Sequence, residues 1–349
     1  MLEVKKEGII IEKRALGFEK EGVLNPAVIA VGDDIHVFYR AVGKGNFSTI
    51  GYCTFDSNLK IKNRLDVPVL FPQFEYEKQG IEDPRIVKID DLFYLTYTAN
   101  DGLNALGALA TSKDLVNWEK RGLIVPECSY DEFIHLAEAR GELNEKYFRF
   151  NGKYILSKKL QKKVLLWDKN VILFPRRINE KLFFLHRIKP DIQIVSLFDL
   201  SELNHSFWDN FFLQFSDYIL ISPKYEHEIS YVGGGCPPIE TQFGWLIIYH
   251  GVHDSVNGYV YCACAALLDL DTPQKEIARL PYPLFEPEYD WELKGIVDNI
   301  CFPTGAFIKN DTLFIFYGAA DEHIACASVS LSGLLNELLL NTIKDENES

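Results

Sequence analysis

Basic side chains recur at one position of a repeated sequence pattern. Five segments carry an apolar, strand-like run around an aromatic or histidine residue, and the residues that directly follow it are Arg40, Thr98, Arg187, His250 and Gly318. Three of these five are cationic or can become so. One isolated arginine would be interpreted as a surface ion pair. Recurrence at one register of an acidic chain instead favours a ring of basic groups that binds an anion, because arginine donates bidentate hydrogen bonds and histidine has a tunable charge.

Polar residues followed by proline open the same segments. Glu82-Asp83-Pro84-Arg85 opens the second segment at the place where Asn25-Pro26 opens the first. Because proline fixes the start of a strand, we expect the polar residue before it to point toward the strand end. An Asp-Pro pair alone is more often simple turn chemistry, and Asp321 alone is typical of a loop. The Gly233-Gly234-Gly235 run that opens the fourth segment lacks the lysine and Ser/Thr of a phosphate-binding P-loop.

The charge of the chain excludes several classes of partner. Among its 349 residues, 50 are acidic and 36 are basic, which gives a formal net charge of −14. This argues against a nucleic-acid groove or an anionic membrane surface. Residues 260–268 form the longest apolar run and end at Asp269, and the first residues lack the apolar stretch of a signal peptide. We therefore expect a cytoplasmic protein that binds neither nucleic acid nor membrane.

The seven cysteines predict neither a disulfide framework nor a metal site. Cys262 and Cys264 alternate along a strand-like run, so they are expected on the same face. No C-x-x-C pair or zinc-like cluster with histidine is present. The favoured interpretation is small buried hydrophobic residues in a reducing compartment.

An internal repeat predicts the architecture that must position these residues. The five segments share a plan of an apolar strand, a tight polar turn, an aromatic strand and a strand of small residues, the last being weak in the third segment. Four-stranded units repeated in this way predict an all-β, five-bladed β-propeller formed by one domain over residues 1–349. Residues 1–24 would help to close the ring. The longest spacing marks a partly helical insertion at about residues 123–165, and residues 331–340 predict a short C-terminal helix. A pair of packed β-sheets is the structural alternative.

The chain resembles glycoside hydrolase family 130 in its motifs and in their order. The resemblance is carried by these motifs and their order: Asn25-Pro26, Tyr39-Arg40-Ala41, Glu82-Asp83-Pro84-Arg85, Leu173-Phe174-Pro175, Leu185-His186-Arg187, Gly233-Gly234-Gly235-Cys236-Pro237-Pro238-Ile239, Gly244-Trp245-Leu246, Tyr249-His250-Gly251-Val252, Leu267-Leu268-Asp269-Leu270, Phe302-Pro303-Thr304-Gly305 and Tyr317-Gly318-Ala319-Ala320-Asp321. It covers nearly the whole chain apart from the insertion and the ends. What it implies is a five-bladed propeller that acts on mannosides.

The resemblance also implies roles for individual residues. Asp83 would be the catalytic acid, which protonates the leaving oxygen through the 3-hydroxyl of mannose. The mannosyl-binding residues would be Asn25, Arg40 and Asp321. The residues that hold an attacking phosphate would be Lys169, Arg187 and His250.

Phosphorolysis and hydrolysis make different demands on such a site. Inversion needs an acid on one face of the sugar and a nucleophile on the other. A phosphate dianion is already nucleophilic and must be held by cations, whereas a hydrolase needs a carboxylate to activate water. The basic set favours an inverting β-mannoside phosphorylase that uses inorganic phosphate as co-substrate, needs no cofactor or metal, and yields α-mannose 1-phosphate.

Two alternatives are left open. One is an inverting β-mannosidase with Glu240 or Glu228 as base, and the other is a carbohydrate-binding propeller without catalysis. The linkage, whether β-1,2 or β-1,4, the acceptor sugar, the role of the insertion and the oligomeric state, including a homo-oligomer, are open as well.

Overall fold

The chain folds mainly into antiparallel β-sheet, as the repeat predicts. This computed structural model describes residues 2–150 and 164–343, so residues 151–163 of the predicted insertion lie outside the described residues. The strands fall into five antiparallel groups. The first group contains β2 (Gly22–Val31), β3 (Asp34–Gly43), β4 (Phe47–Phe55) and β5 (Ile61–Arg64), and the second contains β6 (Gly80–Ile89), β7 (Leu92–Asn100), β8 (Ala105–Ser112) and β9 (Glu119–Leu123). One parallel pair, Ser48 with Gly80, joins these two groups into a single eight-stranded sheet.

The remaining three groups form separate sheets. The third contains β10 (Lys169–Leu173), β11 (Leu182–Arg187), β12 (Ile192–Leu197) and β13 (Ile219–Ile221). The fourth contains β14 (Tyr231–Gly234), β15 (Ile239–Thr241), β16 (Gly244–Ser255), β17 (Gly258–Leu268) and β18 (Glu276–Arg279). The fifth contains β19 (Cys301–Lys309), β20 (Thr312–Ala319), β21 (His323–Ser330) and β1 (Val4–Ile11). The pairing of β1 with β21 joins the two ends of the chain in one sheet.

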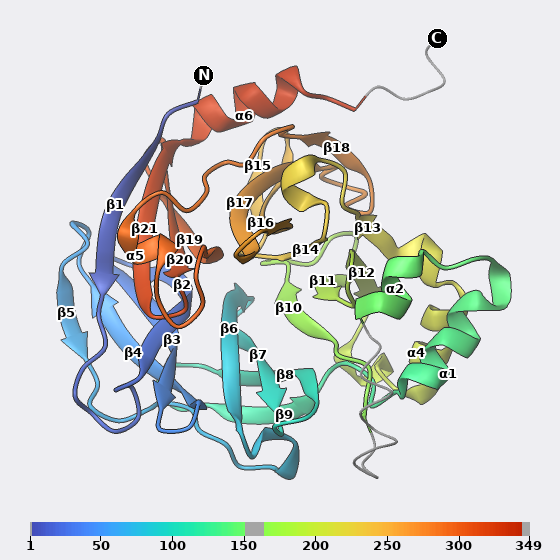
Figure 1. Cartoon of the computed structure of the whole chain (residues 1–349), viewed down its shortest axis with the longest axis horizontal. Helices are drawn as coiled ribbons and strands as arrows, with labels where there is room; N and C mark the ends of the chain where they lie inside the picture. Colours follow the sequence, from blue (N-terminus) through green and yellow to red (C-terminus); the bar gives the residue numbers. More distant parts are fainter. Residues whose placement is uncertain (1, 151–163, 344–349) are drawn as a thin grey trace.

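Successive groups follow one another around the molecule in chain order (Figure 1). Each pair of neighbours, including the fifth and first groups, shares one cluster of buried apolar side chains. Both faces of the middle strands are therefore covered, which explains why these strands read as nearly continuous apolar runs. Tyr39, Tyr97, Tyr249 and Tyr317, the aromatic residues of the repeat, are all buried in these clusters.

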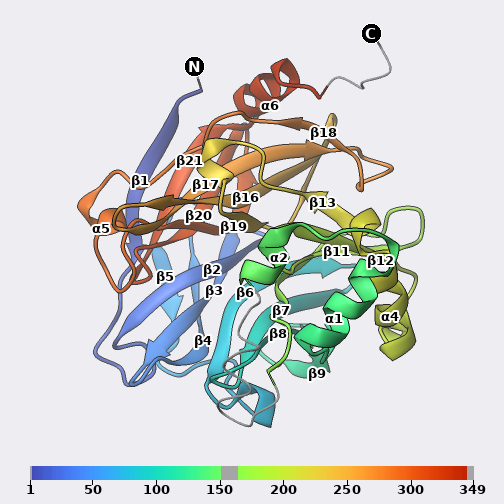
Figure 2. The same ribbon diagram turned by 45° about the vertical axis from the view of Figure 1, so that its right-hand side comes forward.

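Helices gather at two places outside the strand groups. The helix α1 (Tyr130–Ala137) confirms the helical part of the predicted insertion, and α2 (Glu145–Phe150) follows it. Both lie beside α4 (His205–Leu213), on the side of the molecule opposite α5 (Asp290–Leu293) (Figures 1 and 2). The predicted C-terminal helix is confirmed as α6 (Leu331–Leu340). In the part of the chain that the structure describes, none of the helices has the length and apolar character to cross a bilayer.

The helix α4 was not predicted from the sequence. Its buried residues Trp208, Phe211 and Phe212 recur at helical spacing, and the side chain of Asn204 caps its first turn. They pack with Phe133 of α1 in the apolar cluster between the second and third groups. The insertion is therefore anchored to the third group by aromatic packing.

Candidate active site

On the innermost strands, polar residues lie where the regular pairing with the next strand is interrupted. The inner strands β2, β6, β10 and β14 contact one another in chain order, and β19 contacts β2. In β2, β6 and β10 the pairing with the next strand shifts once, and Asn25, Asp83 and Asn170 lie at these shifts with φ of 50°, 50° and 52°. Asparagine and aspartate tolerate this left-handed region, and a β-bulge re-aims the side chain. The bulges of β2 and β6 bring the side chains of Asn25 and Asp83 into hydrogen-bond contact.

Asp83 is buried beside an amide and a guanidinium group. The Nδ2 of Asn25 donates a hydrogen bond of 2.7 Å to Oδ1 of Asp83, and Nη1 of Arg40 lies 3.7 Å from the same oxygen. Burial by itself would raise the pKa of Asp83, but the charges of Arg40 and Lys169 and the hydrogen bond from Asn25 leave this pKa below its ordinary value. Asp83 is therefore ionised at neutral pH in the ligand-free protein.

Glu82 connects the two basic residues on either side of Asp83. Its Oε1 accepts hydrogen bonds of 2.9 Å from Nη2 of Arg40 and 2.9 Å from Nδ2 of Asn100. Its Oε2 lies 3.7 Å from Nζ of Lys169. Since Glu82 is only 3% exposed, this carboxylate holds Arg40 and Lys169 in place within a buried network.

Asp321 belongs to the same electrostatic cluster. It adopts φ of 53° directly after β20. Burial and the carboxylates of Asp83 and Glu82 raise the pKa of Asp321 and the charge of Arg40 lowers it, which leaves this pKa at about 6. The group with Asn25, Arg40 and Asp83 thus contains all three residues expected to bind the mannosyl unit.

A basic group forms across β10, β11 and β16. Lys169 is the direct strand partner of Arg187, and His250 is the strand partner of Gly233. Nη1 of Arg187 lies 3.2 Å from Nε2 of His250. The three residues expected to hold phosphate are therefore neighbours in pairs, and Glu82 links Lys169 to the side of Asp83.

His250 is neutral in this arrangement. Burial and the positive charges of Arg187, Arg85 and Lys189 hold its pKa well below the ordinary value. As a neutral imidazole it accepts the hydrogen bond from Arg187, and Phe302 packs against its ring with 4.4 Å between centroids. The ligand-free site thus has arginine and lysine as its cations, whereas His250 would gain a proton only near an anion.

Two glycines make room for the site. A Cβ on Gly233 would collide with the ring of His250 and lie 2.8 Å from Nη1 of Arg187, and a Cβ on Gly318 would collide with Oδ1 of Asn25. The fifth segment therefore has glycine, Gly318, at the repeated position, because Asn25 occupies the space that a side chain there would need. The triple glycine is a close-approach segment, as expected, and not a phosphate loop.

Sequence reasoning missed four residues of the cluster. They are Glu82 and Arg85 beside Asp83, Asn170 in the third bulge, and Lys189. The guanidinium of Arg85 donates to the backbone oxygens of Asp83 (2.9 Å) and Pro84 (3.0 Å), and burial lowers its pKa to about 10. Nζ of Lys189 lies 3.5 Å from the ring centroid of Tyr231, which Arg187 also approaches at 5.7 Å. Glu82 and Arg85 stand in the Glu82-Asp83-Pro84-Arg85 motif without an assigned role, and the place of Asn170 in the third segment matches Asn25 in the first.

The two carboxylates considered as a hydrolytic base lie in other contacts. Glu240 is exposed and forms an ion pair of 2.6 Å with Arg176. Glu228 is fully buried, accepts a hydrogen bond from Tyr249, and lies 3.1 Å from Nη1 of Arg279. These partners lie outside the group around Asp83, Arg187 and His250, so the structure does not bring either carboxylate into the cluster.

Several buried polar atoms of the cluster have no hydrogen-bond partner. These atoms are Oδ1 of Asn25, Oδ1 of Asn170, Nε of Arg187 and Nδ1 of His250. An unpaired buried polar atom costs about 1–3 kcal/mol, so an accumulation of them is typical of a ligand site. Donors and acceptors lie on the carboxylate side, as a sugar requires, and the basic side suits an anion.

Comparison with known proteins identifies the family. The family described as beta-1,4-mannooligosaccharide phosphorylase, glycoside hydrolase family 130, matches residues 18–339. A 1,2-beta-oligomannan phosphorylase of Thermoanaerobacter sp. (strain X514) is 32% identical over 93% of this chain and 96% of its own. A beta-1,2-mannobiose phosphorylase of the same organism is 35% identical over 89% and 91%.

The fold is similar to that of solved structures. The beta-1,2-mannobiose phosphorylase of Listeria innocua, in complex with beta-1,2-mannobiose, aligns with a TM-score of 0.71 and 23% identity, covering 97% of this chain and all of that one. With a family match over most of its length and relatives that align nearly end to end, the chain belongs to glycoside hydrolase family 130.

Proposed function

We propose that this protein is an inverting β-mannoside phosphorylase that cleaves a non-reducing-end β-mannosyl linkage with inorganic phosphate and releases α-mannose 1-phosphate. The observation that carries the proposal is the juxtaposition of a buried acid, Asp83, with a basic group formed by Lys169, Arg187 and His250. Family membership and the relatives named above support the same reaction.

The proposed chemistry assigns one role to each side of the cluster. Asn25, Arg40 and Asp321 would bind the hydroxyl groups of the mannosyl unit, while the basic group holds phosphate in line with the anomeric carbon. The bond from phosphate oxygen to C1 forms as the glycosidic bond breaks, with inversion. The proton of Asp83 passes to the mannose 3-hydroxyl, whose own proton passes to the leaving oxygen.

Phosphate binding would prepare both ionisable partners. Asp83 is ionised in the ligand-free protein because Arg40 and Lys169 lower its pKa. A bound phosphate dianion would offset the charge of Lys169 and so raise the pKa of Asp83, which makes the acid form accessible when the nucleophile is present. The same dianion would raise the pKa of His250, which then donates a hydrogen bond to it.

The architecture proposed for this reaction is one five-bladed β-propeller over residues 1–349. Its support is the packing of each strand group on the next, including the fifth on the first, and the convergence of the inner strands. A cytoplasmic location, the absence of any required cofactor, and a homo-oligomeric assembly stay predictions.

We propose β-1,2-linked mannooligosaccharides as the first substrates to test, because the relatives that align over most of the chain act on this linkage. The experiment incubates the enzyme with β-1,2- and β-1,4-mannobiose in phosphate and in phosphate-free buffer, and identifies the products. Mannose 1-phosphate that forms only with phosphate is the expected result. Free mannose at equal rates in both buffers would replace the proposal with a β-mannosidase, and sugar binding without turnover would indicate a non-catalytic protein.

A further inference from the structure

Within the described residues, four strand groups contain the same buried set of side chains. A strand tyrosine donates a hydrogen bond to a buried glutamate, which also pairs with a cation. The four sets are Tyr39, Glu19 and Arg64; Tyr97, Glu77 and Lys120; Tyr249, Glu228 and Arg279; and Tyr317, Glu292 and Lys6. Because these positions are equivalent, each group serves as a reference for the others.

The fourth group places metal-ligating side chains where equivalent groups have residues that pack. The turn before the glutamate carries two stacked rings, and in the fourth group the second ring is His227. On the facing strand β17, the partner of Tyr249 is Cys264. In the second and fifth groups the residues at the histidine position are Tyr76 and Trp291, and those at the cysteine position are Ala108 and Ala325.

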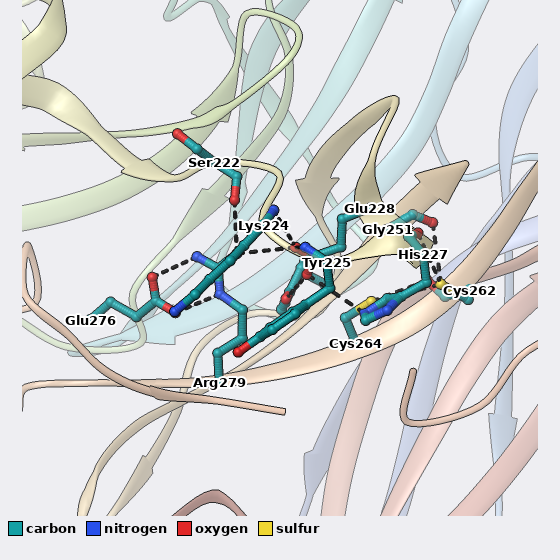
Figure 3. A network of polar contacts seen from close by, with 11 residues as sticks. Ser222, Lys224, Tyr225, His227, Glu228, Gly251, Cys262, Cys264, Glu276 and Arg279 are labelled. Carbon is teal, nitrogen blue, oxygen red and sulfur yellow. Dashed lines mark hydrogen bonds and ion pairs between the residues drawn. The ribbon is translucent and has the colours of Figure 1, made fainter. Parts of the chain in front are cut away.

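The ligand atoms of the fourth group converge (Figure 3). Nε2 of His227, one carboxylate oxygen of Glu228 and Sγ of Cys264 all lie within 4.8 Å of one another, which no other His, Cys, Asp or Glu set does in the described residues. Nε2 of His227 is 3.8 Å from Oε1 of Glu228, and Sγ of Cys262 is 3.8 Å from Sγ of Cys264. Tetrahedral Zn²⁺, with bonds of about 2.0–2.3 Å, holds its ligand atoms roughly 3.3–3.8 Å apart.

An unpartnered nitrogen is a second, independent sign of a ligand. Nε2 of His227 is buried without a hydrogen-bond partner, and the residue is only 9% exposed. A polar atom in this state costs free energy unless a ligand occupies it. The stacked Tyr225 ring, 5.8 Å away between centroids and inclined by 11°, holds the imidazole in its orientation.

We propose that the fourth strand group binds one Zn²⁺-class cation through the converging set of His227, Glu228 and Cys264, with the Cys262 thiol as a neighbour outside that set, 3.8 Å from Sγ of Cys264. The sequence alone predicted no metal site, because His227 is distant from the two cysteines in the chain. A thiolate, imidazole and carboxylate set selects a borderline-soft ion over Mg²⁺ or Ca²⁺.

The charges of this site balance. Binding converts the Cys264 thiol to a thiolate, and its proton passes to solvent. The Cys264 thiolate and the Glu228 carboxylate then offset the dication, while Arg279 keeps its ion pair with Glu276. The charges of the cation and these four side chains therefore sum to zero.

The site is structural and independent of the proposed reaction. It lies behind Gly251, where a Cβ would be 3.0 Å from Sγ of Cys264 and 3.0 Å from Cγ of Glu228. Gly251 follows His250 in β16, and successive strand residues face opposite sides of the sheet. The metal would tie β16 and β17 to the turn that contains His227, on the face opposite to the basic group.

The test measures metal content and does not depend on catalysis. Full-length protein is reduced, stripped with a chelator, exposed to a small excess of Zn²⁺, desalted and analysed for metal. We expect about one Zn²⁺ per chain, and a Zn²⁺-dependent rise in melting temperature. With Co²⁺ in its place, a thiolate charge-transfer band would report ligation by cysteine.

Two variants replace a proposed ligand with the residue that an equivalent strand group has at the same position. His227→Tyr and Cys264→Ala should each weaken Zn²⁺ affinity at least about 10-fold and remove the thermal shift. Cys326→Ala, at a buried cysteine of β21 outside the cluster, is the matched control and should bind like the wild type. If Cys264→Ala fails to fold, His227→Tyr still decides the question. Wild-type protein without retained metal, or variants that retain it equally, would overturn the proposal.

Discussion

The buried polar groups of this molecule differ sharply between its centre and its periphery. The glutamates that pair with strand tyrosines have every oxygen occupied: Glu77, for example, accepts from Tyr97, Lys120 and two backbone N–H groups. At the centre, Asn25, Asn170, Arg187 and His250 each leave one buried polar atom unpartnered. Since both regions are buried to a similar degree, the difference separates glutamate networks that serve the fold from a central group that awaits a ligand. The unpartnered Nε2 of His227, beside Glu228, is the exception at the periphery and marks the proposed metal site.

This contrast predicts opposite effects of substitutions in the two regions. Changes at the periphery should reduce stability and leave turnover intact, because closed networks lose a partner. Changes at the centre should reduce turnover or affinity with little loss of stability, because the unpartnered atoms contribute nothing until a ligand binds.

The largest effect is expected for Asp83→Asn. This nearly isosteric change removes the acid, so turnover of the best β-mannoside should fall about 10²–10⁴-fold while the melting temperature stays close to that of the wild type. Phosphorolysis rates and thermal unfolding measure the two quantities. Wild-type turnover would make Asp83 a turn residue and contradict its catalytic role.

Arg187→Ala should act mainly on phosphate. Losing a charged contact to a buried anion costs about 1.5–3 kcal/mol, which corresponds to roughly a 10- to 150-fold increase in the KM for phosphate. Mannoside affinity, measured at saturating phosphate, should change much less. Lys189→Met is the companion variant. Its increase in the KM for phosphate should be smaller, because Nζ of Lys189 lies over the ring of Tyr231. Equal losses in both substrates would show that Arg187 shapes the whole site.

Tyr97→Phe tests the periphery. Removing the hydroxyl takes away the 2.7 Å hydrogen bond to Oε1 of Glu77 but leaves the ion pair with Lys120, so the free energy of unfolding should fall by about 1–2 kcal/mol. The kcat should remain at the wild-type value. Denaturant titration and steady-state kinetics distinguish the outcomes, and a large drop in kcat with unchanged stability would break the comparison.

Asp321→Asn should increase stability at neutral pH. The pKa of Asp321 is raised to about 6 in the folded protein, so the folded state binds the proton more tightly than the unfolded chain. Stability contributed by this group is present at low pH and is lost as pH rises toward 6. The asparagine variant should therefore gain up to about 3 kcal/mol at pH 7.5 and little at pH 4, by denaturant titration at both values. A gain that does not depend on pH would contradict this origin.

The sequence predicted the part of the site that lies in regular register. Arg40, Arg187, His250 and Gly318 hold equivalent strand positions, so one repeat alignment places them all. Glu82 could not be assigned this way, because its role depends on two side chains, Arg40 and Lys169, that reach it from other strand groups. The repeat pattern thus located strand positions that follow from the backbone, and it missed contacts that depend on how far a side chain reaches.

The helices and the buried glutamates show the same limit. The amphipathic spacing of α6 was sufficient to predict it, whereas α4 lies in a stretch that the repeat pattern did not cover. The pairing of Lys6 with Glu292 joins residues 286 positions apart in the chain, and no local pattern signals it. Long-range contacts of this kind need the fold before they can be recognised.

The pairing of β1 with β21 has a consequence for the order of events during synthesis. β1 precedes the other described strands in the chain and β21 follows them, so β1 finds its partner only after β21 has emerged from the ribosome. Until then the edge of β1 that pairs with β21 is exposed to other chains. The fifth strand group is therefore completed only when two segments that lie far apart in the chain meet. This step is slow because the entropy cost of closing so long a loop must be overcome first. A nascent chain stalled before β21 should accordingly be the form most dependent on chaperones.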